Sequence, residues 1–321
     1  MTVAFLFPGQ GAKGLVAAVQ FAESEPRGKE MLERAAAAAD IQPSELLAKG
    51  GRALERTEVQ QPVLTAVALF VHAELLAAGI KPNVVAGHSL GELPAWAATG
   101  AITTEDAIAI AALRGRLMAK EATRHPGIMI AFSEPSTAVS PVFWRGSLQR
   151  AATQPGIHLA ASNAPGEVVL SGDESAIRTM IRTLSDSLGI DLWRHARRLP
   201  VAGPWHSESM RDAVPELEAA LTHARRGVMQ VPMVLNATGK LAEEEALVPR
   251  LLAGQLVHTI RWTNVMTTLQ DGGATDFVTI APGAVLRSLV RTNLGTDVRV
   301  HATENSNDMQ RTMDALRWSL S

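Results

Sequence analysis

The architecture of this chain follows from the segment Asn83-Val84-Val85-Ala86-Gly87-His88-Ser89-Leu90-Gly91-Glu92. Its apolar first half predicts a short buried strand, and its second half carries a Gly-x-Ser-x-Gly turn that leads into a helix. Glycine is needed at both ends of the turn because a side chain there would collide with a neighbouring strand or helix. Ser89 is therefore expected at the carboxyl end of a sheet, beside free helix N–H groups that favour an oxyanion.

Two interpretations of this turn remain open from the residues alone. The pattern also arises by chance, and a serine before a helix is often only an N-cap. The preceding strand and the helical pattern that ends at Gly100 supply the context that a nucleophilic serine requires. We therefore favour acyl chemistry at Ser89, which needs a base and a substrate anchor.

The composition limits the classes of function. The chain has 321 residues, 46% of them hydrophobic, so we expect a large core with either an insert or a second domain. It has no cysteine, which excludes a disulfide framework, a thiolate nucleophile and a Cys-ligated metal site. A net charge of −2 gives no field for nucleic acid, and no apolar run approaches the ~18 residues of a membrane span. The N-terminus resembles a first strand rather than an export signal, and we expect a cytoplasmic protein.

The first strand is expected at Val3 to Phe7, followed by the loop Pro8-Gly9-Gln10-Gly11. Gly9, Gly11 and Gly14 also match the Gly-x-Gly-x-x-Gly fingerprint of dinucleotide sites, with Glu30 or Glu33 as the ribose ligand. No second strand precedes those glutamates, and Lys29 to Ala39 looks helical instead. A nucleotide-binding module stays the alternative from outside the class of acyl-transfer enzymes.

One basic side chain lies on an apolar helix face. Thr103 caps a helix that runs to about Ala122, and Arg114 shares its apolar stripe with Met118, whereas Arg116 points the other way. A buried guanidinium is costly unless an anion or several carbonyls meet it. The partner of Arg114 is therefore either an internal carboxylate or helix-end carbonyl, or the carboxylate of a substrate held by a bidentate clamp.

Further helices and strands are predicted on both sides of a change in pattern. A helix from Gln61-Pro62 to about Leu76 has Pro62 in its first turn, and Pro94 is expected to kink the helix after Ser89. Residues 125–199 form a compact β-α-β-β-α-β insert, and residues 1–124 with 200–321 form the core. Within the insert we expect strands at Gly127 to Phe132, Ile157 to Ser162 and Glu167 to Ser171, and helices at Val139 to Ala152 and Ser175 to Leu188. A last strand, Leu199 to Ala202, leads back out to the core.

The chain returns to the core at Gly203-Pro204-Trp205-His206, so His206 is placed to face a cleft between core and insert. A lone histidine is more often a cap or a surface group than a base. After it we expect a helix from Ser207 to Arg226, kinked by Pro215, and then alternating strands and helices. The strands are Val231 to Leu235, Asp276 to Ile280 and Val298 to Ala302, and the helices are Leu247 to Val257, Trp262 to Asp271, Val285 to Asn293 and Asn307 to Trp318.

Several short motifs occur together along the chain, namely Phe7-Pro8-Gly9-Gln10-Gly11, Gln61-Pro62, Gly87-His88-Ser89-Leu90-Gly91-Glu92, Arg114-Gly115, Asn163-Ala164-Pro165, His206-Ser207 and Pro282-Gly283. In order and spacing they resemble the malonyl-CoA:acyl carrier protein transacylase family. The resemblance covers nearly the whole chain and implies an α/β-hydrolase-like core with a parallel sheet plus an inserted ferredoxin-like subdomain. Departures from the family pattern at Trp205, Ala281 and Pro94 indicate its stand-alone, trans-acting polyketide synthase type.

The resemblance implies a role for each matching residue. Ser89 becomes the nucleophile and His206 its base, oriented by the backbone carbonyl of Gln255. The backbone N–H groups of Gln10 and Leu90 become the oxyanion hole, and Arg114 binds the free carboxylate of a malonyl group. The substrate-binding group also takes in Gln61, His88, Met118, Asn163, Trp205 and Gln255.

The implied reaction is ping-pong transfer of malonyl from CoA to the phosphopantetheine thiol of an acyl carrier protein, with no bound metal or other cofactor. We expect a monomer whose partners are the carrier protein and a CoA thioester, with no membrane or nucleic acid. The carrier is acidic, so Arg194, Arg197 and Arg198 are candidates for its docking patch, or else an ordinary solvated run. Trp205, where family members have a small residue or phenylalanine, is expected to shrink the pocket and favour unbranched malonyl, or to swing aside for an unusual chain.

Other activities use similar parts. A proofreading thioester hydrolase would use the same serine and histidine with water as acceptor, but such enzymes tend to lack the arginine. A transacylase for an unusual acyl chain between carrier proteins, and the malonyl-transfer subunit of malonate decarboxylase, are further enzyme alternatives; His88 weighs against the latter. A non-catalytic scaffold would bind the carrier without serine labelling.

Overall fold

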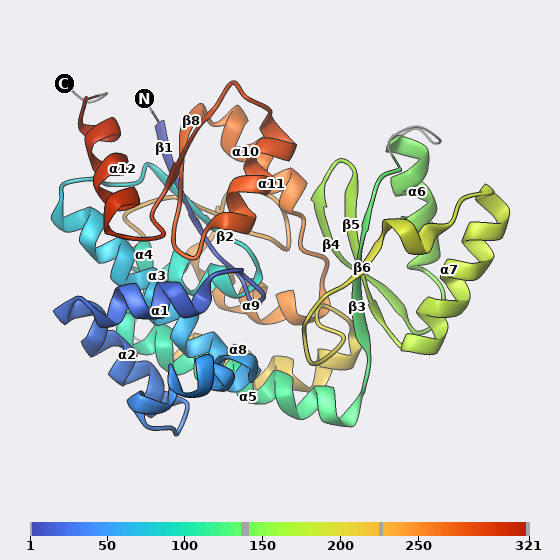
Figure 1. The fold of residues 1–321 in the computed structure, drawn as a ribbon, viewed down its shortest axis with the longest axis horizontal. Coiled ribbons are helices and arrows are strands. Elements are labelled where there is room, and N and C mark those ends of the chain that lie inside the picture. Colours follow the sequence, from blue (N-terminus) through green and yellow to red (C-terminus); the bar gives the residue numbers. More distant parts are fainter. Residues whose placement is uncertain (1, 136–140, 225–226, 319–321) are drawn as a thin grey trace.

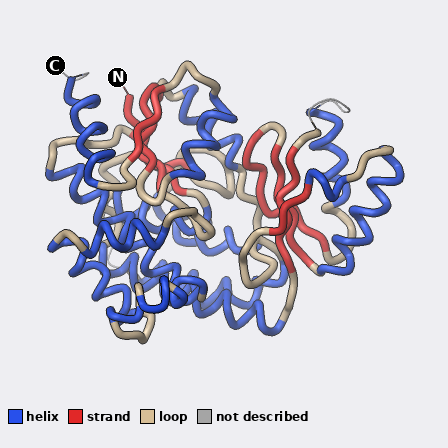
Figure 2. The backbone as a smooth tube through the Cα atoms, viewed as in Figure 1, coloured by secondary structure: helices blue, strands red, loops and turns tan. Residues whose placement is uncertain are grey.

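The computed structural model describes residues 2–135, 141–224 and 227–318 of the chain. It is a mixed α/β protein with two separate sheets, one in the larger body at the left of Figure 1 and one in the smaller body at the right. Figure 2 shows helices around the larger sheet, helices on the right side of the smaller sheet, and loops between the two bodies.

The larger body is built on a parallel sheet with the strand order β7-β2-β1-β8-β9. Its strands are β1 (Thr2–Phe7), β2 (Val84–Gly87), β7 (Met233–Val234), β8 (Ala274–Thr279) and β9 (Arg299–Ala302). The order reverses beside β1, so loops after β1 and β2 emerge at the edge where open α/β sheets bind ligands. The expected parallel sheet is confirmed.

Helices pack around this sheet, and most of them are long enough to bury one of their own faces against it. The helices are α1 (Leu15–Glu23), α2 (Pro26–Ala38), α3 (Thr57–Ala77), α4 (Glu92–Ala98), α5 (Thr104–Arg124), α8 (Val214–His223), α9 (Val248–Gly254), α10 (Trp262–Asp271), α11 (Ala284–Leu294) and α12 (Ser306–Trp318). Figure 1 shows α1, α2, α3 and α5 grouped below the sheet and α10 and α11 to its right.

Helix α3 has the length and composition of a membrane span, which corrects the expectation that no segment approaches one. In the folded chain 78% of its most apolar window is buried inside the protein. Val63, Val67 and Phe70 on this helix belong to the main hydrophobic core. Its apolar character is therefore accounted for by packing in the core.

The smaller body has an antiparallel sheet in the order β4-β5-β3-β6. Its elements follow one another as β3 (Ile128–Ser133), α6 (Pro141–Ala151), β4 (Ile157–Ala164), β5 (Glu167–Gly172), α7 (Glu174–Leu188) and β6 (Ala196–Arg198). This β-α-β-β-α-β succession, with the last strand beside the first, is the ferredoxin-like arrangement.

The two faces of the small sheet are buried in different ways, because successive side chains of a strand point to opposite faces. Ile128, Ile130 and Phe132 join a separate core with α6 and α7, whereas Met129 and Ala131 join the main core. These two cores support our proposal that residues 125–199 form an insert subdomain packed on the core of residues 1–124 and 200–321.

Several predicted boundaries are wrong. Helix α3 begins at Thr57, so Pro62 lies inside it rather than in its first turn. The helix expected from Ser207 is a 3₁₀ segment (Glu208–Ala213) followed by α8, with Pro215 at the start of α8. Its expected end at Arg226 lies outside the described residues, as does the expected start of α6 at Val139.

The insert closes with β6 at Ala196–Arg198, three residues before the strand expected at Leu199 to Ala202. Pro94 lies in the first turn of α4, where the missing N–H costs no helical hydrogen bond. Helix α2 follows directly on α1, so Glu30 and Glu33 lie on a helix and not at the end of a second strand. The dinucleotide interpretation therefore lacks its acidic ligand.

Candidate active site

Ser89 lies on a sharp turn between β2 and α4. Strands β1 and β2 are parallel with Phe7 opposite Gly87, and Ser89 has a left-handed φ of 51°. A Cβ at Gly87 would come within 2.0 Å of the Gly91 backbone, and one at Gly91 within 2.2 Å of the Phe7 carbonyl oxygen. Both glycines are thus required by close backbone approach, which is the strained geometry of a nucleophile elbow.

The turn brings Ser89 against a histidine from the return segment. The Ser89 Oγ lies 2.8 Å from His206 Nε2, and His206 Nδ1 lies 2.9 Å from the carbonyl oxygen of Gln255. A carbonyl only accepts, so Nδ1 carries the proton and Nε2 is free to accept from the serine hydroxyl. The arrangement can deprotonate Ser89 without a triad carboxylate.

Burial keeps His206 neutral. The imidazole is 6% exposed. Its burial lowers the pKa of His206 to about 3, the nearby charges of Arg114 and His88 act in the same direction, and the hydrogen bond to Gln255 opposes them. The group is therefore a neutral proton acceptor throughout the physiological range.

Arg114 on α5 points at the same serine. Its Nη1 donates to Gln61 Oε1 at 2.8 Å, and its Nη2 donates to Gln255 Oε1 at 3.0 Å and lies 3.4 Å from Ser89 Oγ. Burial lowers the pKa of Arg114 to about 10, against the opposing effect of Glu92. Its contacts are neutral amide oxygens, so the cation is free to exchange them for a carboxylate beside Ser89.

Gln10 and Met118 both contact Gln61, the first amide partner of Arg114. The Gln10 Oε1 accepts from Thr57 at 2.9 Å and from Gln61 Nε2 at 3.3 Å. Gln61 Nε2 also lies 3.3 Å from the sulfur of Met118, which is buried. The structure therefore brings Gln10 and Met118 together at Gln61, the residue that accepts from Arg114.

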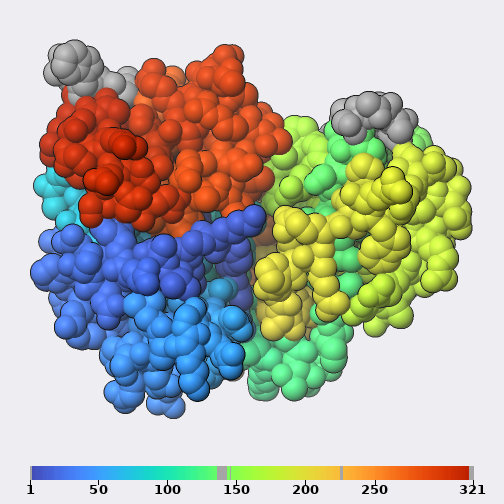
Figure 3. Space-filling view, in the orientation of Figure 1, coloured from blue at the N-terminus to red at the C-terminus, as the bar shows by residue number. Residues whose placement is uncertain are grey.

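His88 and Asn163 line a cleft between the two bodies. The His88 Nε2 lies 2.9 Å from Asn163 Oδ1, and Asn163 Nδ2 donates to Glu167 at 2.9 Å. Burial lowers the pKa of His88. The cleft is a cavity of about 480 Å³ that Gln10 and Arg197 also line. Figure 3 shows the blue N-terminal segment meeting the yellow segment of the insert along this boundary.

His206 itself lines a second cavity of about 490 Å³, between α6 and α9. Leu90, the residue after Ser89, is fully buried at the start of the elbow helix. Trp205 is 3% exposed, and a Cβ at Gly203 would meet its ring at 2.8 Å. The indole Nε1 of Trp205 has no hydrogen-bond partner among the described residues.

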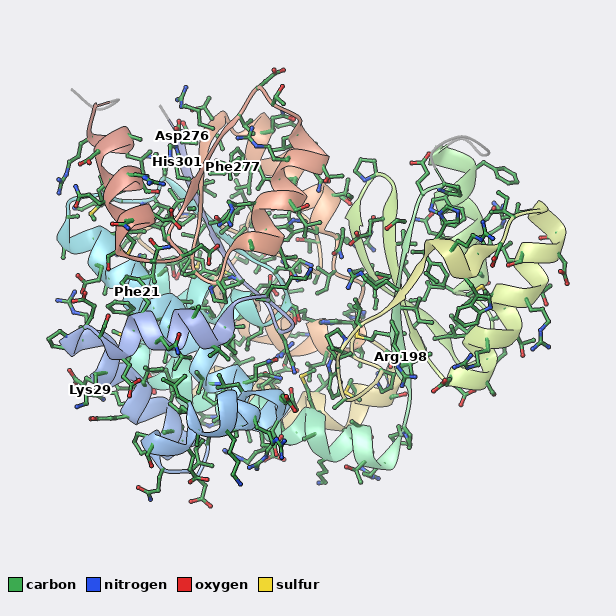
Figure 4. All side chains as sticks on the ribbon, viewed as in Figure 1. Phe21, Lys29, Arg198, Asp276, Phe277 and His301 are labelled. Atoms are coloured by element: carbon green, nitrogen blue, oxygen red, sulfur yellow. The ribbon has the colours of Figure 1, made fainter. Side chains whose placement is uncertain are left out.

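The three arginines predicted to form one docking patch point in different directions. Arg197 lines the cleft and makes no ion pair with a described residue. Arg198, labelled in Figure 4, binds Glu174 on α7 at 3.4 Å and lies beside Ile130, whose side chain faces α6 and α7. Arg194 binds Asp191 at 3.3 Å and is 82% exposed. Alternation along β6 explains why Arg197 faces the cleft and Arg198 does not.

Sequence reasoning missed Asn236 and gave Glu92 no role. Both are buried: Asn236 Oδ1 accepts from the Ser89 amide at 2.8 Å, and Glu92 Oε1 in turn accepts from the Asn236 amide at 2.7 Å. Burial raises the pKa of Glu92 to about 8, although its hydrogen bonds and Arg114 act in the opposite direction. Glu92 directly follows the Gly-x-Ser-x-Gly turn, but no local signal marks Asn236.

A separate charged cluster lies at the amino end of the main strands, away from the elbow. Asp276 binds Arg299 at 2.6 Å and His301 at 2.9 Å, and Figure 4 labels Asp276 and His301 close together. Among the described residues, no group of three or more His, Asp or Glu side chains has the arrangement of a metal site. The expectation of a metal-free protein stays a prediction.

Comparison with known proteins places the chain among acyl-transfer enzymes. The sequence profile of the family described as "Acyl transferase domain" matches residues 4–316. The malonyl CoA-acyl carrier protein transacylase of Bacillus subtilis is 30% identical over 295 residues, which cover 90% of this chain and 89% of that protein.

Solved structures agree with this. The malonyl-CoA:acyl carrier protein transacylase of Xanthomonas oryzae superposes with a TM-score of 0.86 at 30% identity, over 98% of this chain and 99% of the other. A malonyl-transacylase solved in complex with its type II polyketide synthase acyl-carrier protein has a TM-score of 0.86 at 25% identity, over 98% and 100% of the two chains.

Proposed function

Because the chain belongs to the acyl transferase domain family, we propose that it transfers malonyl from CoA to the phosphopantetheine thiol of an acyl carrier protein. One observation carries the proposal most directly: the Oγ of Ser89 lies 2.8 Å from His206 Nε2 and 3.4 Å from Arg114 Nη2. A nucleophile, a base and a carboxylate anchor thus meet at one oxygen.

In the first half-reaction the Ser89 Oγ attacks the thioester carbonyl of malonyl-CoA. His206 Nε2 takes the hydroxyl proton, and the imidazolium is stabilised by its Nδ1 contact with the Gln255 carbonyl at 2.9 Å. The tetrahedral intermediate collapses, its C–S bond breaks, and the proton passes from Nε2 to the CoA sulfur. A malonyl ester on Ser89 and free CoA result.

We assign the oxyanion hole to the backbone N–H groups of Leu90 and Gln10. Leu90 lies in the 3₁₀ turn Ser89–Gly91 that leads into α4, and Gln10 lies in the loop after β1, the strand that pairs with β2. The amide of Ser89 itself is taken by Asn236. Donors fixed by the fold in this way stabilise charge that develops on the carbonyl oxygen.

The malonyl carboxylate replaces one or both amide oxygens on Arg114. Exchange of a neutral acceptor for a carboxylate on a buried guanidinium gives a charge-assisted pair, which discriminates malonyl from acetyl. It also neutralises the positive charge that helps to lower the pKa of His206. Carboxylate binding thus makes the base stronger when a correct substrate is in place.

In the second half-reaction the phosphopantetheine thiol of the carrier attacks the malonyl ester. His206 accepts the thiol proton and returns it to the Ser89 Oγ as the ester bond breaks. CoA and carrier share the same arm, so one cleft serves both in turn, with Arg197 on its wall. Transfer needs only a thioester donor and a thiol acceptor, and we propose no bound cofactor, a monomer and a cytoplasmic location.

Incubation with malonyl-CoA, followed by mass spectrometry of the peptide that contains Ser89, tests this assignment. A malonyl ester on Ser89 is expected, with little acetyl ester from acetyl-CoA and none in the Ser89→Ala variant. Modification of another residue, or no covalent adduct in a folded protein, would contradict the proposed function.

A further inference from the structure

We propose that Asn236 and Glu92 are positioning residues that hold the reactive conformation of Ser89 and tie it to the His206 base. They act through the backbone of Ser89 and through Gln255, and neither contacts the reacting atoms. The inference rests on the proposed function, since it concerns the reactivity of the same serine.

Asn236 clasps the elbow from the loop after β7. Its Oδ1 accepts from the Ser89 amide at 2.8 Å, and its Nδ2 donates to the Gly87 carbonyl at 2.7 Å. Its own amide donates to Glu92 and its carbonyl accepts from Arg261 at 3.1 Å. All four polar groups of a residue that is 0% exposed are thus engaged.

Gln255 holds the other side of the same peptide unit. Its Nε2 donates to the Ser89 carbonyl at 2.9 Å and makes a short contact with Glu92 Oε2. Its backbone carbonyl accepts from His206. Ser89 is therefore fixed through its amide by one side-chain amide and through its carbonyl by another.

Glu92 connects Asn236, which binds the Ser89 amide, with Gln255, which binds the Ser89 carbonyl. One carboxyl oxygen accepts from the Asn236 amide and the other from Gln255 Nε2, so the carboxyl bridges residues that are 144 and 163 positions away in the chain. The side chain is 2% exposed, and water competes little for these contacts. Displacement of Asn236 or Gln255 is thereby transmitted to its counterpart.

This network has a reason in the strain of the elbow. A non-glycine residue with φ of 51° stays there only when its surroundings hold it. Asn236 and Gln255 hold the amide and the carbonyl of Ser89 and so direct its Oγ at His206. They also occupy the Ser89 amide, which leaves Leu90 and Gln10 as the donors to the oxyanion.

The test measures reactivity of Ser89 in two ways, in Asn236→Ala, in Glu92→Gln and in the control Asn305→Ala. Asn305 also accepts from a backbone amide, that of Asp308 at 3.0 Å, but on the exposed start of α12. The first measure is the single-turnover rate of Ser89 acylation over a range of malonyl-CoA concentrations. The second is the labelling rate with diisopropyl fluorophosphate, which forms an O–P bond with loss of fluoride and needs no carboxylate clamp. Thermal unfolding shows which variants are folded.

In both Asn236→Ala and Glu92→Gln, acylation and labelling are expected to slow on the order of 10²-fold, as for a misplaced nucleophile. The half-saturating malonyl-CoA concentration is expected to change less than about threefold in Asn236→Ala. A lower acylation rate with a nearly unchanged half-saturating concentration is not what a general loss of structure gives. Asn305→Ala keeps the wild-type rates. Glutamine at position 92 retains the shape of the glutamate side chain and one of its two acceptor oxygens. The Glu92→Gln variant therefore tests the proposal even if Asn236→Ala does not fold.

Wild-type labelling rates in a folded Asn236→Ala or Glu92→Gln variant would overturn the positioning role. Absence of labelling in the wild-type protein would instead refute Ser89 as the nucleophile. The two failures are therefore distinguishable.

Discussion

The substitution Arg114→Ala is expected to remove the preference for a carboxylated acyl group. Arg114 is 2% exposed, and two of the three hydrogen-bond partners of its guanidinium are amide oxygens that a substrate carboxylate can replace. Loss of one partner from a buried, hydrogen-bonded charge pair costs about 2–5 kcal/mol. At about 1.4 kcal/mol per factor of ten, kcat/KM for malonyl-CoA should fall roughly 30-fold to several thousand-fold.

Acetyl-CoA offers no carboxylate to Arg114, so the substitution removes no ion pair with this substrate. Its kcat/KM should therefore change less than about tenfold, which corresponds to about 1.4 kcal/mol. The variant leaves Glu92 without a nearby cation, but burial already raises the pKa of that carboxyl to about 8, so it takes up a proton rather than remaining an unpaired charge. The protein is therefore expected to fold.

The assay compares malonyl-CoA and acetyl-CoA in rates of Ser89 acylation. The matched control is Arg116→Ala, which removes an arginine from the same helix whose guanidinium binds the Ala38 carbonyl at the surface. An unchanged malonyl preference in folded Arg114→Ala would refute the clamp. An equal effect in Arg116→Ala would show that helix α5, and not the cation beside Ser89, sets the selectivity.

Three further results are expected. Because Arg197 lines the cleft, Arg197→Glu should raise the KM for the acidic carrier protein about tenfold and leave acylation of Ser89 by malonyl-CoA unchanged. Arg194→Glu and Arg198→Glu should have smaller effects on this KM. Equal losses of rate in both half-reactions would argue against a role of Arg197 in carrier docking. His72 is buried against Phe5 and Phe7, and this burial lowers its pKa to about 4. As the pH falls from 7 to 5 the unfolded chain takes up a proton at His72 before the folded protein does, so the free energy of unfolding should decrease by about 2 kcal/mol. Urea unfolding at both pH values should show a smaller decrease in His72→Leu, and an identical decrease would refute the assignment. Gly91→Ala should lower the free energy of unfolding by about 3 kcal/mol, because its Cβ would lie 2.2 Å from the Phe7 carbonyl oxygen; wild-type stability would show that the elbow can relax.

Local sequence signals were sufficient for the elements around the nucleophile. The apolar run before Ser89, the glycines at 87 and 91 and the Thr103 cap act over a few residues, and β2, the elbow and α5 lie where they were expected. Boundaries failed where tertiary contacts extend or shorten an element. Helix α3 starts five residues before Pro62 because packing outweighs the proline.

The meeting of distant side chains was not available from the residues alone. His206 was paired with Ser89 only through the family resemblance, since a lone histidine before a helix has many uses. Asn236 was missed because its contacts with Ser89 span 147 positions and its neighbours carry no motif. The separation of Arg197 from Arg198 required the pairing of β6 with β3, which sets the face of each side chain.

Transfer from isolated malonyl-enzyme to a holo carrier protein tests the ping-pong account most directly. Malonyl-CoA is removed after acylation of Ser89, the carrier is added, and the malonyl content of both proteins is followed over time. We expect malonyl-carrier to appear at the rate at which the Ser89 ester disappears, with slow loss to water in the absence of carrier. An ester that the carrier does not discharge, or that water removes equally fast, would contradict transfer through Ser89.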